Sequence, residues 1–228
     1  DSEEKIGQFT SELNQIYQSA TAENQIKQAS LIAIAASAKR ISPLLEKMSP
    51  QVSIAMENCP HQTVIACLED ALDETMDWLG QQRLIYELLP FDRPYHTPMF
   101  HSYASRLRPF LDKWITRAPQ TKTYTCTLAA PFSDNIDDIR QTAYDHWLQP
   151  VQFSQTISNM HADGVRIFVE VGTGGNLTAF IRDILRQQEH IAMAANIKNR
   201  SGLTQLNHLV GLLYAQGAVS YTHLRAHE

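Results

Sequence analysis

Histidines are the side chains of this sequence that could do acid–base or metal chemistry, and their spacing helps to decide between the two. The chain has 9 of them. Zinc pairs on a helix need a spacing of three or four residues, whereas His96 and His101 are five apart. His61 lies two residues after Cys59 in a predicted turn, where a structural cysteine is more common than a thiol nucleophile. The pattern predicts no metal site.

His96 is the candidate general base. It lies in Leu-Pro-Phe-Asp-Arg-Pro-Tyr-His-Thr-Pro, where Pro90, Pro94 and Pro98 favour an extended, irregular backbone. The loop joins two predicted subdomains, and a histidine fixed at such a junction can face a cleft. Neutral imidazole accepts a proton near neutral pH. Taken alone, the pattern also fits a histidine that makes only a structural hydrogen bond, which is the commoner case.

A glycine-rich turn follows the predicted strand Val-Arg-Ile-Phe-Val-Glu-Val-Gly at residues 165–172. Such a turn before a helix can bind a nucleotide or S-adenosylmethionine. Position argues against this, because about fifty residues follow and a doubly wound domain needs several more strand–helix units. The favoured interpretation is tight strand-to-helix packing, with Asn176 or Thr173 capping the helix.

Composition excludes several classes of protein. The 228 residues are 43% hydrophobic and carry a net charge of -5, so no basic stripe is available to neutralise nucleic-acid phosphates. The longest apolar run, residues 31–38, is too short to span a bilayer. Three scattered cysteines indicate free thiols in a reducing, cytoplasmic compartment.

The elements that must position these residues follow from hydrophobic periodicity. Residues 1–30 predict a helix, because apolar side chains recur at intervals of three and four. The next segment predicts strand-helix-strand-strand-helix-strand, the ferredoxin-like split unit, over 31–37, 38–48, 52–58, 62–68, 68–82 and 83–91.

Beyond residue 91 the pattern alternates between helices and strands, which indicates a parallel α/β layer. Helices are predicted at about 98–114, 152–160, 176–188 and 203–217, a polar loop followed by a helix at 133–147, and strands at 121–129, 165–172 and 190–197. The strand at 165–172 is apolar and β-branched, as expected for burial on both faces.

Three segments, taken together, resemble the acyltransferase family that contains malonyl-CoA:acyl-carrier-protein transacylase and the acyltransferase domains of polyketide and fatty-acid synthases. Glu-Asn-Cys-Pro-His-Gln at 57–62 resembles the family's Asn-x-Pro-x-Gln turn, and residues 89–100 resemble the segment with its catalytic histidine. Residues 147–178 resemble its long C-terminal signature. The resemblance covers about residues 30–218 and is nearest to synthases of the enediyne or polyunsaturated-fatty-acid type.

The resemblance implies roles for five residues. His96 matches the catalytic base, and Gln149, before the Pro-Val pair, matches the residue whose backbone carbonyl orients that base. Tyr95, Asn58 and Val171 are assigned to the substrate pocket. Tyr95 has the bulk typical of malonyl-selective members, although packing inside the loop is the alternative. No cofactor or metal is implied.

The fold implied is an α/β-hydrolase-like large subdomain with an inserted ferredoxin-like small subdomain. Residues 1–30 would lead into the large subdomain, 31–91 would form the small one, and 92–219 would form the C-terminal part of the large one. Residues 220–228 resemble a read-through sequence and are interpreted as a non-native tail. The chain has no Gly-x-Ser-x-Gly nucleophile motif, so we expect an N-terminally truncated, incomplete domain that is inactive alone.

The function implied is transfer of a malonyl or similar acyl group from coenzyme A to an acyl carrier protein through an acyl-serine. The expected partners are acyl-CoA, the acyl carrier protein and neighbouring synthase domains, without nucleic acid or membrane. One alternative is a non-catalytic acyltransferase-like module that docks carrier protein in a megasynthase. Another is a methyltransferase built on the glycine-rich turn.

Overall fold

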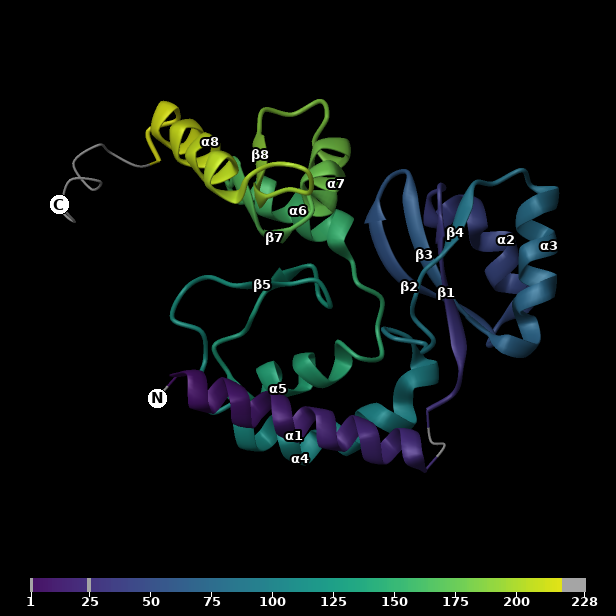
Figure 1. The fold of residues 1–228 in the computed structure, drawn as a ribbon. Helices are drawn as coiled ribbons and strands as arrows, with labels where there is room; N and C mark the ends of the chain where they lie inside the picture. The colour runs from purple at the N-terminus through teal and green to yellow at the C-terminus, as the bar shows by residue number, and fades with distance from the viewer. Residues whose placement is uncertain (1, 24–25, 219–228) are drawn as a thin grey trace. The chain divides into compact units, whose positions relative to one another are not determined.

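The computed structural model describes residues 2–23 and 26–218, which divide into two compact units (Figure 1). The first unit ends at Met160, and the second begins at His161. The predicted tail at 220–228 lies outside the described residues. Within the described ranges, the helices are all too short or too polar to cross a membrane.

Two long helices of the first unit lie side by side. Helix α1 (Ser2–Ala22) packs along α4 (His101–Trp114), as Figure 1 shows. The predicted helix over 1–30 therefore ends earlier, at Ala22. The apolar stripes of both helices form one core cluster, which includes Leu13, Ile16, Tyr17, Phe100, Tyr103, Leu107 and Phe110.

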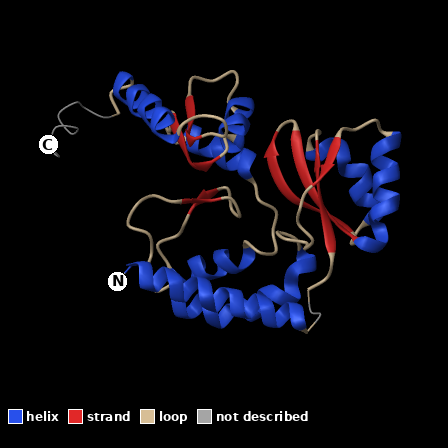
Figure 2. Ribbon diagram, viewed as in Figure 1, coloured by secondary structure: helices blue, strands red, loops and turns tan. Residues whose placement is uncertain are grey.

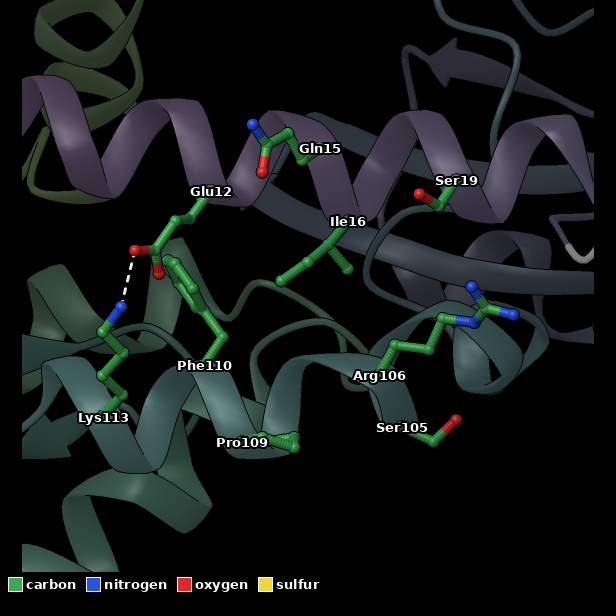
Figure 3. A pocket seen from close by; sticks show the side chains of 9 residues that line it. All are labelled: Glu12, Gln15, Ile16, Ser19, Ser105, Arg106, Pro109, Phe110 and Lys113. Atoms are coloured by element: carbon green, nitrogen blue, oxygen red, sulfur yellow. Dashed lines mark hydrogen bonds and ion pairs between the residues drawn. The ribbon is translucent and has the colours of Figure 1, made fainter.

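A groove of about 620 Å³ lies between α1 and α4 (Figure 3). Its cations are paired with carboxylates of α1 and of the residue that follows it: Lys113 Nζ lies 2.6 Å from Glu12 Oε1, and the Arg106 guanidinium binds Glu23. Among the residues that line the groove, neither cation is left for an anionic ligand.

A four-stranded antiparallel sheet forms the centre of the first unit. Its strands are β1 (Ala29–Ile34), β2 (Val52–Cys59), β3 (Gln62–Leu68) and β4 (Tyr86–Leu88), in the spatial order β2-β3-β1-β4. The helices between them are α2 (Ala38–Met48) and α3 (Leu72–Gln81), with the short 3-10 helix η1 (Glu69–Ala71) before α3. This confirms the element order predicted from the sequence.

The last of these strands is shorter than the predicted range 83–91. The Leu89 N–H still donates to the Leu31 carbonyl over 2.8 Å, but Pro90 has no N–H to continue the ladder. The regular strand therefore ends before the proline, although the Ala29 N–H of β1 still donates to the Asp92 carbonyl at 3.1 Å.

The two faces of the sheet have different neighbours. Helices α2 and α3 cover one face (Figure 2), where Ile32, Ile34 and Ile65 pack with Leu44 and Leu79. Because side chains alternate along a strand, the intervening residues point to the other face. There, Tyr95 and Met99 pack against a cluster that includes Leu31, Val64 and Ala66. The loop that carries His96 is thus held against the sheet face opposite the helices.

The rest of the first unit consists of short elements after this loop. They are the 3-10 helix η2 (Pro98–Phe100), β5 (Tyr124–Thr125), β6 (Ala130–Pro131), α5 (Ile136–Asp145) and α6 (Phe153–Ala162), which runs across the unit boundary. The predicted strand over 121–129 is wrong as a single strand. The chain turns back through Ala129, whose φ is 51°, and pairs β6 with β5.

The second unit holds β7 (Ile167–Thr173), α7 (Asn176–Ile184), β8 (Ile191–Asn196) and α8 (Gly202–Ala215). Strands β7 and β8 are parallel, as predicted. The predicted burial of β7 on both faces is wrong for this chain, since Val169 is 38% and Val171 89% exposed. Among the described residues, β7 has one strand neighbour, β8, and much of its surface is uncovered.

Candidate active site

His96 lies in a tightly fixed loop. Its φ is 61°, a left-handed conformation that is uncommon for residues other than glycine, although histidine, asparagine and aspartate adopt it more often than most. Around it, the buried Thr97 hydroxyl donates to the Pro94 carbonyl at 2.7 Å, and the Tyr95 N–H donates to the Arg93 carbonyl at 2.9 Å. These contacts hold the strained residue in place.

The imidazole of His96 is oriented by a backbone carbonyl. Its Nδ1 lies 2.7 Å from the His146 carbonyl oxygen. Because a carbonyl can only accept, Nδ1 carries the proton and Nε2 keeps its lone pair. A ring with one nitrogen held and the other unprotonated has the form required of a general base.

The acceptor differs from the predicted one. The sequence prediction assigned the carbonyl of Gln149, whereas in this structure the carbonyl on His96 Nδ1 belongs to His146. The reason lies in the last turn of α5. The helical donor for the His146 carbonyl would be residue 150, four positions later, and Pro150 has no N–H. The Gln149 N–H donates instead to Asp145 over 2.8 Å, so the His146 carbonyl remains available.

The Pro150-Val151 segment is tied to the sheet. The Val151 N–H donates to the Ala55 carbonyl at 2.9 Å, and the Glu57 N–H donates to the Val151 carbonyl at 2.8 Å. This pairing forms a parallel bridge between Met56 of β2 and Val151. The end of α5 and the sheet are therefore fixed to each other beside the His96 loop.

A second imidazole touches the first. The rings of His96 and His146 have centroids 4.7 Å apart and are inclined at 67°. Burial lowers the pKa of His96, and the hydrogen bond to the His146 carbonyl offsets part of this effect. Burial, and then the charge of His96, lower the pKa of His146. Both rings are therefore neutral at pH 7.

Tyr95 packs inside the loop in this structure. Its ring lies 5.0 Å from Phe100 by centroids, and its hydroxyl oxygen lies 3.3 Å from that of Tyr17. Burial, followed by the Tyr17 hydrogen bond, raises the pKa of Tyr95. These contacts agree with the packing alternative, and a role in selectivity stays a prediction.

The other predicted pocket residues have different surroundings. Asn58 lies at the end of β2, where its Nδ2 donates to Gln62 Oε1 at 2.9 Å and links the first and last residues of the Asn-x-Pro-x-Gln turn. Val171 belongs to the second unit. The structure thus brings Tyr95 and His96 together, and the assignments of Asn58 and Val171 to a pocket stay predictions.

The glycine-rich turn uses its polar groups internally. The carboxylate of Glu170 accepts from the Gly175 N–H at 3.2 Å, from the Thr178 N–H at 2.8 Å and from the Thr178 hydroxyl at 2.7 Å. A phosphate at a helix N-terminus would need those amides. The nucleotide-binding alternative is therefore disfavoured, and the capping residue is Glu170 rather than the predicted Asn176 or Thr173.

The remaining candidate side chains are two histidines and three cysteines. His61 and His101 are exposed, and none of the three cysteines is in a disulfide. Within residues 2–23 and 26–218, no group of three His, Cys, Asp or Glu side chains could hold a metal ion.

His146 is the site residue that sequence reasoning missed. The signal was Pro150, which marks the carbonyl four residues earlier as one without a helical donor.

Comparison with known proteins identifies the family. Residues 16–226 match the model of the acyl transferase domain family. The chain belongs to this family, as the resemblance predicted.

Individual relatives give the same assignment. The chain is 28% identical over 176 residues to 6-methylsalicylic acid synthase of Penicillium terrestre, covering 74% of the chain and 10% of that protein. It is 22% identical over 158 residues to malonyl CoA-acyl carrier protein transacylase of Bacillus subtilis, covering 68% and 49%.

A solved structure shows the same fold. The acyl transferase domain of SpnD, in complex with 2-(pent-4-yn-1-yl)malonyl, aligns with a TM-score of 0.76 at 20% identity, covering 82% of this chain and 46% of that one. The chain thus spans about half or less of the length of these relatives.

Proposed function

We propose that this chain supplies the general base of an acyl transferase domain that moves a malonyl or similar acyl group from coenzyme A to an acyl carrier protein. The observation that carries the proposal is the orientation of His96, whose Nδ1 is held by a carbonyl at 2.7 Å while Nε2 keeps its lone pair. The setting would be polyketide or fatty-acid biosynthesis, as in the relatives.

The reaction would proceed in two half-reactions through an acyl-serine. In the first, His96 Nε2 takes the proton of the serine hydroxyl while its oxygen attacks the thioester carbonyl. The C–S bond then breaks, and the imidazolium returns the proton to the leaving coenzyme A thiolate. In the second, His96 deprotonates the carrier-protein thiol, which attacks the acyl-serine, and the proton returns to the serine oxygen.

The serine itself would come from residues outside these 228, since the sequence contains no Gly-x-Ser-x-Gly. The first unit would then be an inserted ferredoxin-like small subdomain, 31–91, with parts of an α/β-hydrolase-like large subdomain. The strand order β2-β3-β1-β4 supports the ferredoxin-like assignment. Without the serine, this chain would be inactive alone.

Acyl selectivity would depend in part on Tyr95. Its ring precedes His96 directly, and an aromatic group beside the acyl α-carbon would disfavour a methyl branch by about 1–3 kcal/mol. Asn58 and Val171 stay proposed pocket residues, on the basis of the family resemblance alone. The acyl carrier protein and neighbouring synthase domains are the proposed partners, in the cytoplasm.

The test is His96→Ala in the acyl transferase protein that includes the serine segment. Removing a positioned general base should lower acyl-serine formation by about 10²–10⁴, measured by intact mass after rapid mixing with malonyl-CoA. His101→Ala is the matched control, because His101 is exposed on α4. Loading by His96→Ala at the wild-type rate would favour a non-catalytic, carrier-docking module.

A further inference from the structure

One residue, His146, contacts His96 in two ways. Its backbone carbonyl accepts from Nδ1 at 2.7 Å, and its side-chain ring meets the His96 ring at a centroid distance of 4.7 Å and an angle of 67°. An edge-to-face pair of this kind has a preferred geometry, and so it restricts rotation of the ring. The carbonyl would be present whatever the side chain, whereas the second contact depends on the imidazole.

The His146 ring is itself fixed from several sides. Its Nδ1 lies 3.4 Å from the Thr127 hydroxyl oxygen. The Trp147 ring meets it at 6.3 Å and 76°. The backbone is held by the bond from the His146 N–H to the Thr142 carbonyl, at 2.9 Å. A side chain that is fixed in this manner can hold its neighbour in turn.

We propose that the His146 imidazole is a positioning residue for His96: it holds the ring edge-to-face in the orientation that places Nδ1 on the carbonyl, and it covers part of the ring from solvent. This inference rests on the proposed function of His96. The sequence prediction placed the orienting carbonyl at Gln149 and gave the side chain of His146 no role.

The charged and titratable groups near the two rings have other partners. On the His96 loop, Arg93 pairs with Asp92 at 3.1 Å, and Tyr95 binds Tyr17. On α5, Asp145 accepts from Gln141 at 2.8 Å. Cys126 and Tyr124 line an apolar cavity of about 430 Å³ that His146 also borders. Among the described residues, neither ring donates a hydrogen bond to a carboxylate.

Two imidazoles in contact titrate as a pair, because the first proton disfavours the second. The pKa of each ring is already lowered by burial. A base that stays neutral at lower pH keeps its activity there, so the pair should extend acyl loading toward acid. Removing the second ring should expose His96 and move its pKa up, toward about 6.5.

The experiment compares His146→Gln, which removes the aromatic ring, with His146→Phe, which keeps the ring but cannot titrate. The first readout is the pKa of His96, measured by hydrogen–deuterium exchange at its Cε1 with mass spectrometry, which needs no activity. The second is the pH profile of acyl-serine formation in the protein with the serine segment. His101→Gln is the control.

We expect His146→Gln to raise the pKa of His96, to move the acid limb of the profile to higher pH, and to slow loading at pH 8 by about ten- to a hundredfold, as for a misplaced catalytic group. His146→Phe should recover most of that loss and should turn the two-step titration into a single step. If both variants keep the wild-type His96 titration and loading, the proposal is wrong. Failure of the proposed function would appear separately, as normal loading by His96→Ala.

Discussion

The loop around His96 and the turn at Gly172–Gly175 both contain left-handed backbone, and both bring a polar side chain to the end of a helix. His96 has a φ of 61°, and its ring N–H reaches a carbonyl at the C-terminus of α5. Gly174 and Gly175 have φ values of 141° and 131°, and the Glu170 carboxylate reaches amides at the N-terminus of α7. Each side chain complements the helix end it meets.

The two sites differ in how much hydrogen-bonding capacity they use. Both carboxylate oxygens of Glu170 accept, from two amides and a hydroxyl. Among the residues that the structure describes, His96 makes its hydrogen bond through Nδ1 alone, and the same carbonyl that holds the ring leaves Nε2 without a proton. The Glu170 carboxylate, whose two oxygens both accept hydrogen bonds, stabilises the fold. The His96 imidazole still has a ring nitrogen that can accept a proton. In the sequence, both segments were candidates for a functional site. The difference in hydrogen bonding favours the His96 loop as the reactive site and the glycine-rich turn as a structural one.

Glu170→Ala should give the largest loss of stability. Three amide or hydroxyl donors at the start of α7 would lose their acceptor, and we expect a loss of about 2 kcal/mol in the free energy of unfolding. Urea unfolding of the protein measures it. Glu170→Gln keeps an oxygen acceptor and should lose less. A change below about 0.5 kcal/mol in Glu170→Ala would remove the distinction between the two sites.

Glycine at position 96 should be more stable than alanine, the reverse of the usual order. The φ of 61° disfavours any residue with a Cβ, by about 1 kcal/mol. The free energies of unfolding of His96→Gly and His96→Ala test this directly, since both variants lose the imidazole. An alanine variant as stable as the glycine variant would mean that the loop relaxes when the ring is absent.

Acid should weaken the two sites in different pH ranges, and this is the smallest effect. The pKa values of His96 and His146 are lowered in the fold, so the unfolded chain binds protons first and stability falls as the pH drops below about 6.5. At Glu170, burial raises the pKa, but the hydrogen bonds from Thr178 and the amides outweigh it and the pKa is lowered. That contribution is present above about pH 4.3 and is lost as the pH falls further.

Thermal melting between pH 8 and pH 3 separates these ranges. His146→Phe should flatten the dependence of the melting temperature between pH 7 and pH 5, and Glu170→Gln should flatten it below pH 4.5. A profile that either variant leaves as steep as in the wild type would mean that other groups carry the acid sensitivity.

Periodicity predicted most of the helices and the order of elements in 31–91, because each element there has a clear apolar face. The predicted strand at 121–129 failed because nothing local marks Ala129 as the turn, and its φ of 51° depends on tertiary contacts. The strand at 165–172 was composed like a core strand, yet Val171 is 89% exposed. The composition of a strand indicates which of its side chains are suited to burial. Whether they are buried depends on the elements that pack against the strand.

At the site, the motif located His96 but not its acceptor. A family signature assigns the carbonyl before the Pro-Val pair, whereas the geometry follows from which carbonyl lacks a helical donor, here that of His146. At Tyr95, the sequence did not predict the contact with Tyr17, whose hydroxyl oxygen lies 3.3 Å from that of Tyr95. Contacts between residues distant in sequence are set by packing, which a local pattern does not encode.

The His96–His146 pair also affects the order of events as the protein folds. The two residues are separated by 50 positions, so their contact closes a long loop and requires the sheet, the His96 loop and the end of α5 to be in place. Non-local contacts of this kind form late, because the entropy of closing the loop is lost before the contact can stabilise it. We therefore expect the base to be assembled among the last steps of folding. A partly folded chain would contain His96 without the carbonyl and ring contacts that orient its imidazole.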